Sequence, residues 1–256
     1  MIEFVNLHKS FGQQRVLNGI NLTIPHGQIT AIIGQSGSGK SVLIKHLVAL
    51  IRPDSGQVLV DGAELGQLHG KALDLVREKF GVLFQGGALF DSMTLFDNVA
   101  FPLREKTRLA EAEIAKRAIQ RLEAVGLADM GHKYPAELSG GMKKRAALAR
   151  ALVQDPKIIL FDEPTTGLDP ILLNSIHRLI LDAHKRFGFT AVVISHEVPE
   201  IFDIAQTVAL LHDGVIVECG SPEVIMASAN PVVRQFITGG SQGPIRPGPG
   251  SPSSSP

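Results

Sequence analysis

The chain has 256 residues, enough for one domain or for one domain with a second unit inserted into it. Hydrophobic residues make up 44% and charged residues 20%, an ordinary balance for a globular protein with a large core. Lysine and arginine balance aspartate and glutamate at 25 each, so the chain lacks the basic excess of a nucleic-acid-binding protein. These values disfavour DNA or RNA as a partner.

Two features bear on the compartment in which the protein works. The single cysteine, Cys219, excludes an internal disulfide framework and, lying in an apolar stretch, is predicted to be a buried packing residue. Residues 1–5 have a strand-like pattern and not that of a signal peptide. Apolar stretches such as 42–51, broken by Lys45 and His46, fall short of the roughly 20 residues that a membrane-spanning helix needs. A membrane role is therefore expected only through a partner.

The predicted elements alternate between strand and helix. Apolar runs predict strands at 2–7, 20–24, 28–33, 57–60, 80–84, 158–161, 190–194 and 208–211. Helices are predicted at 39–51, which Arg52-Pro53-Asp54 stops, and at 171–187. Between them, 96–154 reads as almost wholly helical, with Pro102, Gly126 and Pro135 as interruptions. The pattern predicts an α/β core with a helical insertion at about 86–155.

The main domain is expected to span residues 1–240. The remaining segment, 241–256, is rich in proline, glycine and serine and cannot bury enough surface to order itself. It is expected to be a disordered end, or to become ordered on a partner.

Residues 34–41, GQSGSGKS, match the phosphate-loop pattern G-x-x-x-x-G-K-[ST] between an apolar strand and a helix. In such a loop, backbone N–H groups and the helix N-terminus surround phosphate oxygens. Lys40 is predicted to reach the β- and γ-phosphates, and the Ser41 hydroxyl to hold Mg²⁺. The predicted nucleotide-binding residues are Gly34, Gln35, Ser36, Gly37, Ser38, Gly39, Lys40, Ser41 and Val42.

A second motif, KIILFDE, covers residues 157–163. Its apolar residues predict a central strand that ends at Asp162, placed to bind Mg²⁺ through water. Glu163 follows directly and is predicted to act as general base on the attacking water. Together with the phosphate loop, this strand predicts a nucleoside triphosphatase.

Residues 138–142, LSGGM, open a helix that continues to Leu152. The segment resembles the signature motif of ABC ATPases, in which Ser139, Gly140 and Gly141 of one subunit would contact the γ-phosphate held by the other. A helix start made of small residues suits this role, because it offers backbone donors and a positive dipole end. The alternative is an ordinary capped helix, and the position of the motif between the phosphate loop and the Asp162 strand favours the signature.

Other positions fit the same family in order. Gln85 resembles the glutamine that senses Mg²⁺ and water, and Gly167-Leu168-Asp169 resembles the loop that crosses the dimer seam. His196 resembles the switch histidine, and Phe11 is a candidate for stacking on adenine. The resemblance covers about residues 1–230 and implies a RecA-like core, an N-terminal antiparallel β-subdomain and an inserted helical subdomain.

Met142 stands where most ABC signatures carry Gln. With the segments at 83–105 and 230–244, it gives a resemblance to the ATPases of the Mla/Mce lipid transport systems. This resemblance implies transport of phospholipids or other lipids between inner and outer membranes. It also implies an MlaE-like permease, an MCE-domain protein and a STAS-domain protein as partners, with the chain at the cytoplasmic face of the inner membrane.

An apolar segment follows Gln85, at the place where ABC domains receive the permease's coupling helix. Its members are Leu89, Phe90, Met93, Phe96, Val99 and Phe101. Some of them are expected to form the core of the helical unit itself. Ala88, Leu89, Phe90 and Met93 are expected to contribute to a docking surface.

The resulting hypothesis is a head-to-tail homodimer that binds two ATP molecules at its seam and powers a permease. An ABC importer for amino acids, metals or lipoproteins is the alternative within the family. A non-transport ABC ATPase acting on ribosomes or DNA is disfavoured by the single domain and the neutral charge. An unrelated P-loop kinase or GTPase lacks the signature.

Overall fold

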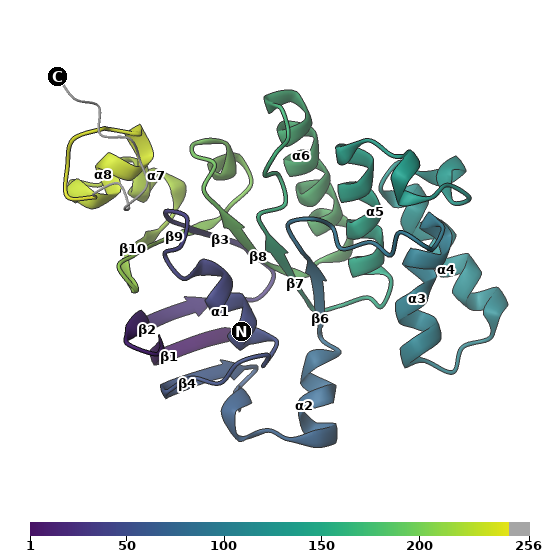
Figure 1. Cartoon of the computed structure of the whole chain (residues 1–256), viewed down its shortest axis with the longest axis horizontal. Coiled ribbons are helices and arrows are strands. Elements are labelled where there is room, and N and C mark those ends of the chain that lie inside the picture. Colours follow the sequence, from purple (N-terminus) through teal and green to yellow (C-terminus); the bar gives the residue numbers. More distant parts are fainter. Residues whose placement is uncertain (246–256) are drawn as a thin grey trace.

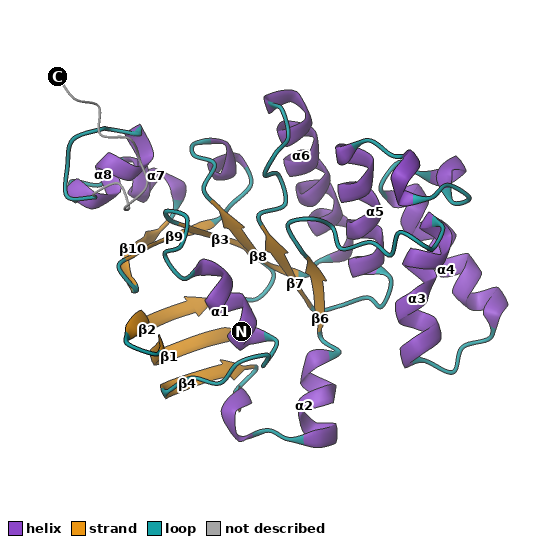
Figure 2. Cartoon of the chain, viewed as in Figure 1, coloured by secondary structure: helices purple, strands orange, loops and turns teal. Residues whose placement is uncertain are grey.

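The computed structural model describes residues 1–245 of the chain. Two β-sheets and several groups of helices make up this part (Figure 1). The smaller sheet is antiparallel, the larger one is mostly parallel, and a separate group of helices flanks one edge of the larger sheet (Figure 2).

The smaller sheet has the strand order β2-β1-β4-β5 and comes from the first part of the chain. Its strands are β1 (Ile2–Phe11), β2 (Gln14–Ile24), β4 (Ser55–Val60) and β5 (Ala63–Glu64). The first two are longer than the predicted 2–7 and 20–24, because they pair along a hairpin that closes at Phe11 and Gln14. This pairing places Phe11 at the turn, beside the start of β2.

The larger sheet has the order β10-β9-β3-β8-β7-β6. Its strands are β3 (Ile29–Ile33), β6 (Phe80–Leu83), β7 (Ile158–Asp162), β8 (Thr190–Ser195), β9 (Thr207–His212) and β10 (Val215–Gly220). All neighbours are parallel except β10, which runs antiparallel to β9 along the sheet edge. The predicted central strands are confirmed, whereas β10 is not among the predicted elements.

The central strands are buried on both faces, as their continuous apolar runs indicate. Alternate side chains enter different cores because successive residues of a strand point to opposite faces. Ile32 and Leu160 pack towards the antiparallel sheet, while Phe161 and Val193 pack towards the helices on the other side. Both β3 and β7 are thus packed on each face, and this packing fixes the position of the polar residues that follow them.

The long helical stretch predicted at 96–154 consists of three α-helices joined by turns. They are α3 (Leu95–Lys106), α4 (Glu111–Ala124) and α5 (Gly140–Leu152), with short 3₁₀ turns η2 (Ala128–Met130) and η3 (Pro135–Glu137) before α5. Gly126 and Pro135 lie between helices as predicted, but Pro102 lies inside α3 and does not end it. The buried face of α3, which includes Val99 and Leu103, outweighs the one backbone hydrogen bond that proline removes.

The remaining helices lie outside this group. They are α1 (Lys40–Leu47), α2 (Gly70–Arg77), α6 (Pro170–Phe187), α7 (Pro222–Met226) and α8 (Pro231–Thr238), with 3₁₀ turns η1 (Leu65–Gln67) and η4 (Glu200–Asp203). The predicted helix at 39–51 ends earlier, at Leu47, because Ala49 adopts φ 52° and turns the chain. Helix α2 is not among the predicted elements. Among residues 1–245, no helix has the length and apolar character needed to cross a bilayer.

Two features of the carboxyl-terminal part differ from the sequence-based expectation. Cys219 is exposed, so the prediction of a buried packing residue is wrong: it sits on the edge strand β10, which has a neighbour on one side only. The segment after α8 folds back on the helix, where the side-chain amide of Gln235 both accepts from the N–H of Ile245 and donates to its carbonyl. Residues 246–256 of the predicted tail lie outside the described part of the chain.

Candidate active site

The phosphate loop follows β3 and leads into α1. Gly34, Gly37 and Gly39 all have positive φ, a region that favours glycine because a Cβ would be strained there. A Cβ on Gly34 would overlap the carbonyl oxygen of Leu211 at the end of β9, so this glycine lets the loop lie directly against the sheet. Ser36 and Gly37 at the tip are exposed.

Lys40 begins α1 and is only 4% exposed. Its Nζ donates to the carbonyl oxygens of Gly34 and Gln35, both at 2.7 Å, so the ammonium is bound to the first two residues of the phosphate loop. Burial lowers the pKa of Lys40 below its ordinary value, while the negative charges of Glu163 and Asp162 oppose that shift. The ammonium is therefore held by backbone carbonyls beside two carboxylates.

Ser41 and Asp162 join the phosphate loop to the end of β7. The Ser41 hydroxyl donates to Oδ1 of Asp162 at 3.3 Å, although the two residues are far apart in sequence. Burial raises the pKa of the Asp162 carboxyl above its ordinary value, and the Ser41 hydrogen bond opposes that shift. The structure thus brings the predicted metal ligands Ser41 and Asp162 together.

Glu163 lies next to Asp162 and is surrounded by three polar side chains. Gln85 donates from Nε2 to Oε2 of Glu163 at 3.2 Å, and Thr166 donates from its hydroxyl to the same oxygen at 3.1 Å. On the other side, Nδ1 of His196 lies 3.4 Å from Oε1. The predicted catalytic residues Glu163, Gln85 and His196 therefore meet at one carboxylate.

The backbone of Glu163 is also fixed. Its φ is 49°, uncommon for a residue other than glycine. Its N–H donates to the carbonyl of Ile194 on the neighbouring strand β8 at 3.1 Å. Residues held in this region are concentrated at functional sites, because surrounding structure must compensate for the strain. We refer to Lys40, Ser41, Asp162 and Glu163 as the catalytic edge.

Ser139, Gly140 and Gly141, here called the signature segment, belong to a different part of the chain. Ser139 caps α5 by accepting a hydrogen bond from the N–H of Met142 at 3.3 Å. Gly140 lies beside Leu168 and Gly141 beside Leu172 of the same chain. Ser139 and Gly140 are exposed, and Figure 1 shows α5 beyond β6 and β7, away from α1. The structure does not bring the signature segment to Lys40 within one chain.

Three further predicted residues are Asp169, Phe11 and Val42. Asp169 caps α6, its Oδ1 accepting from the N–H groups of Ile171 and Leu172 at 3.0 Å each. Phe11 is 50% exposed at the end of β1, and Nζ of Lys9 lies 5.5 Å from its ring centroid. The exposed ring is therefore available for stacking and is not part of a core. Val42 is partly buried on the first turn of α1 and packs against the core.

A cavity of about 890 Å³ opens beside the tip of the phosphate loop. Its walls come from the loop, the start of β2, the turn between β9 and β10, and the segment around α8. Ser38 of the loop has a buried hydroxyl with no hydrogen-bond partner among the described residues. A buried hydroxyl of this kind fits a polar ligand at the loop.

Several residues near the catalytic edge have no role predicted from the sequence. Thr166 contacts Glu163, as described, and its position shortly after that residue is the only local signal for it. Lys144 and Arg150, both on α5, bond to backbone carbonyls of the segment that begins at Gln85. No pattern in the sequence distinguishes these two cations from solvent-facing ones.

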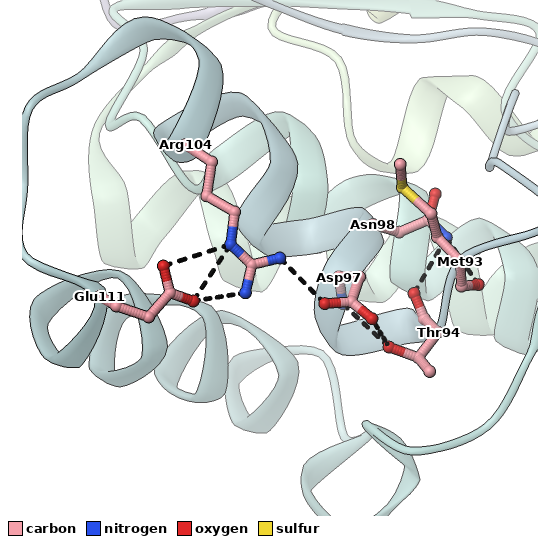
Figure 3. Close-up of polar contacts among 6 residues, drawn as sticks. All are labelled: Met93, Thr94, Asp97, Asn98, Arg104 and Glu111. Carbon is pink, nitrogen blue, oxygen red and sulfur yellow. Dashed lines mark hydrogen bonds and ion pairs between the residues drawn. The ribbon is translucent and has the colours of Figure 1, made fainter.

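The segment after Gln85 is held by Asn98 of α3. This fully buried amide accepts from the N–H of Phe90 at 2.8 Å and donates to the carbonyls of Phe90, Met93 and Thr94 at 3.0 to 3.2 Å. Figure 3 shows Asn98 beside Met93 and Thr94, with Asp97 and Arg104 on the same helix. These hydrogen bonds fix the conformation of residues 90–94.

The apolar side chains of this segment divide between core and surface. Leu89 and Phe96 pack against the core, and Val99 belongs to it. Phe90 is 42% exposed and lies edge-on to Phe101, with ring centroids 4.9 Å apart. Ala88 is exposed and Met93 is partly buried. The exposed part of the predicted docking surface therefore centres on Ala88 and Phe90.

Arg104 links α3 to α4 on the outer side of this group. Its guanidinium donates to both carboxylate oxygens of Glu111 and, at 2.9 Å, to Oδ1 of Asp97 (Figure 3). Asp97 also accepts from the hydroxyl of Thr94, the cap of α3, at 2.6 Å. This polar network joins the start of α3 to α4, and it is independent of the catalytic edge.

Comparison with known proteins identifies the family. The family model described as ABC transporter matches residues 17–166. A protein of Mycobacterium leprae described as a probable ribonucleotide transport ATP-binding protein is 45% identical over 95% of this chain and 70% of its own length. The intermembrane phospholipid transport system ATP-binding protein MlaF of Escherichia coli is 44% identical over 91% of this chain and 87% of its own length. MlaF of Haemophilus influenzae is 42% identical over 96% and 93%, respectively.

Solved structures agree with the predicted fold. The dimeric ATP-binding cassette MJ0796 in a post-hydrolysis state with ADP and Pi is 32% identical, with a TM-score of 0.78 over 87% of this chain and 99% of that one. cbiO1 of Clostridium perfringens is 30% identical, with a TM-score of 0.83 over 91% and 93%. The predicted ABC fold and the resemblance to MlaF are therefore confirmed. This chain belongs to the ABC transporter family: it is an ATP-binding subunit of a transporter, and it is an ATPase.

Proposed function

We propose that the chain hydrolyses ATP at a site shared between two copies arranged head to tail. The observation that carries this proposal is the separation of two sets of residues in one chain. The catalytic edge gathers a lysine, a hydroxyl and two carboxylates, while Ser139 and Gly140 are exposed at the start of another helix. A second copy would bring its own signature segment to the phosphate loop, and the dimeric relative supports this arrangement.

Magnesium fits the oxygen atoms at this site. The Ser41 hydroxyl and the Asp162 carboxylate are hard donors of the type that Mg²⁺ takes alongside phosphate oxygens. Bound there with ATP, the ion would neutralise charge that develops on the phosphates. The raised pKa of the Asp162 carboxyl fits a group whose charge is disfavoured until a cation is present.

The residues of the chain then have separate roles in hydrolysis. Lys40 exchanges its two carbonyl partners for the β- and γ-phosphates. Glu163 accepts a proton from the attacking water, while Gln85 and His196 orient its carboxylate and contact the γ-phosphate side. Phe11 stacks on adenine, and Asp169 positions the loop at the dimer seam. Closure on ATP and opening after hydrolysis drive the permease.

The transported substrate in our proposal is phospholipid or another lipid. The MlaF relatives from two species, which match nearly the whole chain, support it. The implied partners are an MlaE-like permease, an MCE-domain protein and a STAS-domain protein, with the chain on the cytoplasmic face of the inner membrane. Ala88 and Phe90, exposed beside the Asn98 anchor, supply the surface for a permease helix.

Ribonucleotide transport is a second candidate. The mycobacterial relative carries that description and is as similar to this chain as the MlaF proteins are. In both cases the chain would supply ATP hydrolysis and a permease the transport path, so the experiment follows both cargoes.

The experiment is purification of the full chain with its native membrane partners, followed by reconstitution into liposomes. We expect ATP-dependent transfer of labelled phospholipid between donor and acceptor vesicles, and its loss with Glu163→Gln. Flux of a labelled ribonucleotide without lipid transfer would contradict the lipid assignment. Recovery of ribosomes or DNA in place of a permease would contradict a transport role.

A further inference from the structure

Helix α5 carries the basic run Lys143-Lys144-Arg145, which Met142 separates from the signature segment. Lys144 is the unusual member, because it is only 7% exposed. A buried ammonium is costly unless it is paired and hydrogen-bonded. Nζ of Lys144 donates to the backbone carbonyl of Gln85, which satisfies part of that requirement.

The charges around Lys144 come from the candidate active site. Burial lowers the pKa of Lys144, while the negative charges of Glu197 and Glu163 oppose that shift. Glu197 follows His196 and accepts a hydrogen bond from the hydroxyl of Thr165. The ammonium thus lies among groups that belong to the strand ends of β7 and β8.

Gln85 connects this lysine to the catalytic carboxylate. Its backbone carbonyl accepts from Lys144, and its side chain donates to Oε2 of Glu163 at 3.2 Å. The hydrogen bond from Lys144 to the Gln85 carbonyl restrains the backbone of Gln85, and so restrains the position of its side chain. A shift of α5 would therefore shift Gln85 and, through it, the hydrogen bond to Glu163.

Arg150 adds further hydrogen bonds between α5 and the segment that begins at Gln85. Its guanidinium donates to the carbonyl of Gly87 at 2.8 Å and to that of Ala88 at 2.7 Å. Both acceptor residues have positive φ, 75° and 48°. Lys144 and Arg150 together hold the backbone of residues 85–88 from one helix.

The same helix begins at the signature segment, since Ser139 is its cap. We propose that Lys144 is a positioning residue that ties the signature helix α5 to Glu163 of the same chain through Gln85. Contact of Ser139 with the ATP of the partner copy would then also set the position of this chain's Glu163. The inference rests on the proposed shared site and on Glu163 as its general base.

The test compares variants of the full chain, purified with its partners, at saturating ATP and Mg²⁺. Lys144→Met keeps the length and removes the donor, and we expect kcat to fall about tenfold because a misplaced catalytic group slows the chemical step. The Kd for a fluorescent ATP analogue should stay within about twofold, since Lys40 and the loop are untouched. Lys144→Arg should restore most of kcat, because it retains a charged donor.

Lys143→Met is the matched control. Lys143 precedes Lys144 on α5 and is partly exposed. The kcat of the Lys143→Met variant should therefore match that of the unmodified chain. A double-mutant cycle with Gln85→Ala then tests the route. If Lys144 acts through Gln85, adding Lys144→Met to Gln85→Ala should lower kcat no further.

Three results would overturn the proposal. They are an unchanged kcat in Lys144→Met, fully multiplicative effects in the double variant, and a joint loss of melting temperature and ATP affinity that Lys144→Arg does not prevent. Failure of the proposed function looks different, because Glu163→Gln would then turn over at the unmodified rate. An inactive Glu163→Gln beside a fully active Lys144→Met would contradict the Lys144 proposal alone.

Discussion

In the catalytic edge the charged groups have partners within the chain, whereas Ser139 and Gly140 of the signature segment are exposed at the start of α5. Lys40 is held by two carbonyls, and Glu163 by three side chains. The Ser139 side chain makes one hydrogen bond, which caps its own helix.

The two regions also differ in what holds them. The catalytic edge is attached to strands that are buried on both faces, so its geometry is set by the core. The signature segment is the start of α5, which contacts β6, the strand at the edge of the larger sheet. In the proposed shared site, the first region is therefore formed within one chain, and the second would gain its contacts from a second copy.

The largest expected effect separates chemistry from binding within the catalytic edge. Glu163→Gln should lower ATP hydrolysis about a thousandfold, because the amide cannot accept the proton of the attacking water. ATP should still bind, since Lys40 and Ser41 remain, whereas Lys40→Ala should weaken binding itself. Phosphate release and equilibrium ATP binding measure the two quantities. Turnover of Glu163→Gln at the unmodified rate would contradict the assignment of Glu163 as the general base.

The next effect tests whether the two regions act across two chains. Lys40→Ala and Ser139→Arg should each lower hydrolysis about a hundredfold when every chain carries the change. When the two variants are mixed and allowed to exchange subunits, activity should return to about a quarter, because random pairing leaves that share of composite sites intact.

A chain that carries both changes provides the control for this mixture. Mixed with the unmodified chain, it forms heterodimers in which neither site is intact, so it should suppress activity. No recovery in the first mixture, together with no suppression in the second, would show that both regions serve the same chain's ATP.

A smaller effect concerns the stability of the catalytic edge without nucleotide. The pKa of Asp162 is raised on folding, so its contribution to stability is present at low pH and is lost as pH rises through the folded-state pKa. At neutral pH the buried charge is unfavourable, and Asp162→Asn should raise the melting temperature by about 2 °C. The gain should vanish at low pH, where the native carboxyl is protonated. An equal gain at all pH values would contradict the charge as its cause.

The smallest effect belongs to the signature segment. Ser139→Ala removes the cap of α5 and should lower the free energy of unfolding by about 0.5–1 kcal/mol, as measured with urea. Ser139→Asn, which retains a capping acceptor, should keep that stability. Loss of several kcal/mol would mean that the segment is held by more than its cap.

Each half of the catalytic edge can be predicted from the sequence because a local motif specifies it. A phosphate loop between β3 and α1 and a carboxylate at the end of β7 follow from motifs and strand order. Ser41 and Asp162 come into contact because β3 and β7 both run parallel to β8, which lies between them, and so end at the same side of the sheet. The larger part of the fold is predictable for the same reason.

The remaining features depend on contacts that periodicity does not encode. Lys144 reads as part of a solvent-facing basic run, and only its tertiary neighbour Gln85 explains its burial. Cys219 lies in an apolar run, yet the edge position of β10 leaves it exposed. Pro102 lies inside α3 because burial of the helix outweighs the tendency of proline to interrupt a helix.

The cavity beside the phosphate loop has a consequence for inhibitor selectivity. One wall consists of loop residues such as Ser36 and Gly37, whose pattern recurs among P-loop ATPases. Another wall includes Phe236 of α8 and Ile245, which Gln235 holds against that helix. A small molecule that spans both walls would contact residues outside the shared nucleotide motifs. Screening against this second wall therefore offers a route to compounds that distinguish this ATPase from others of its family.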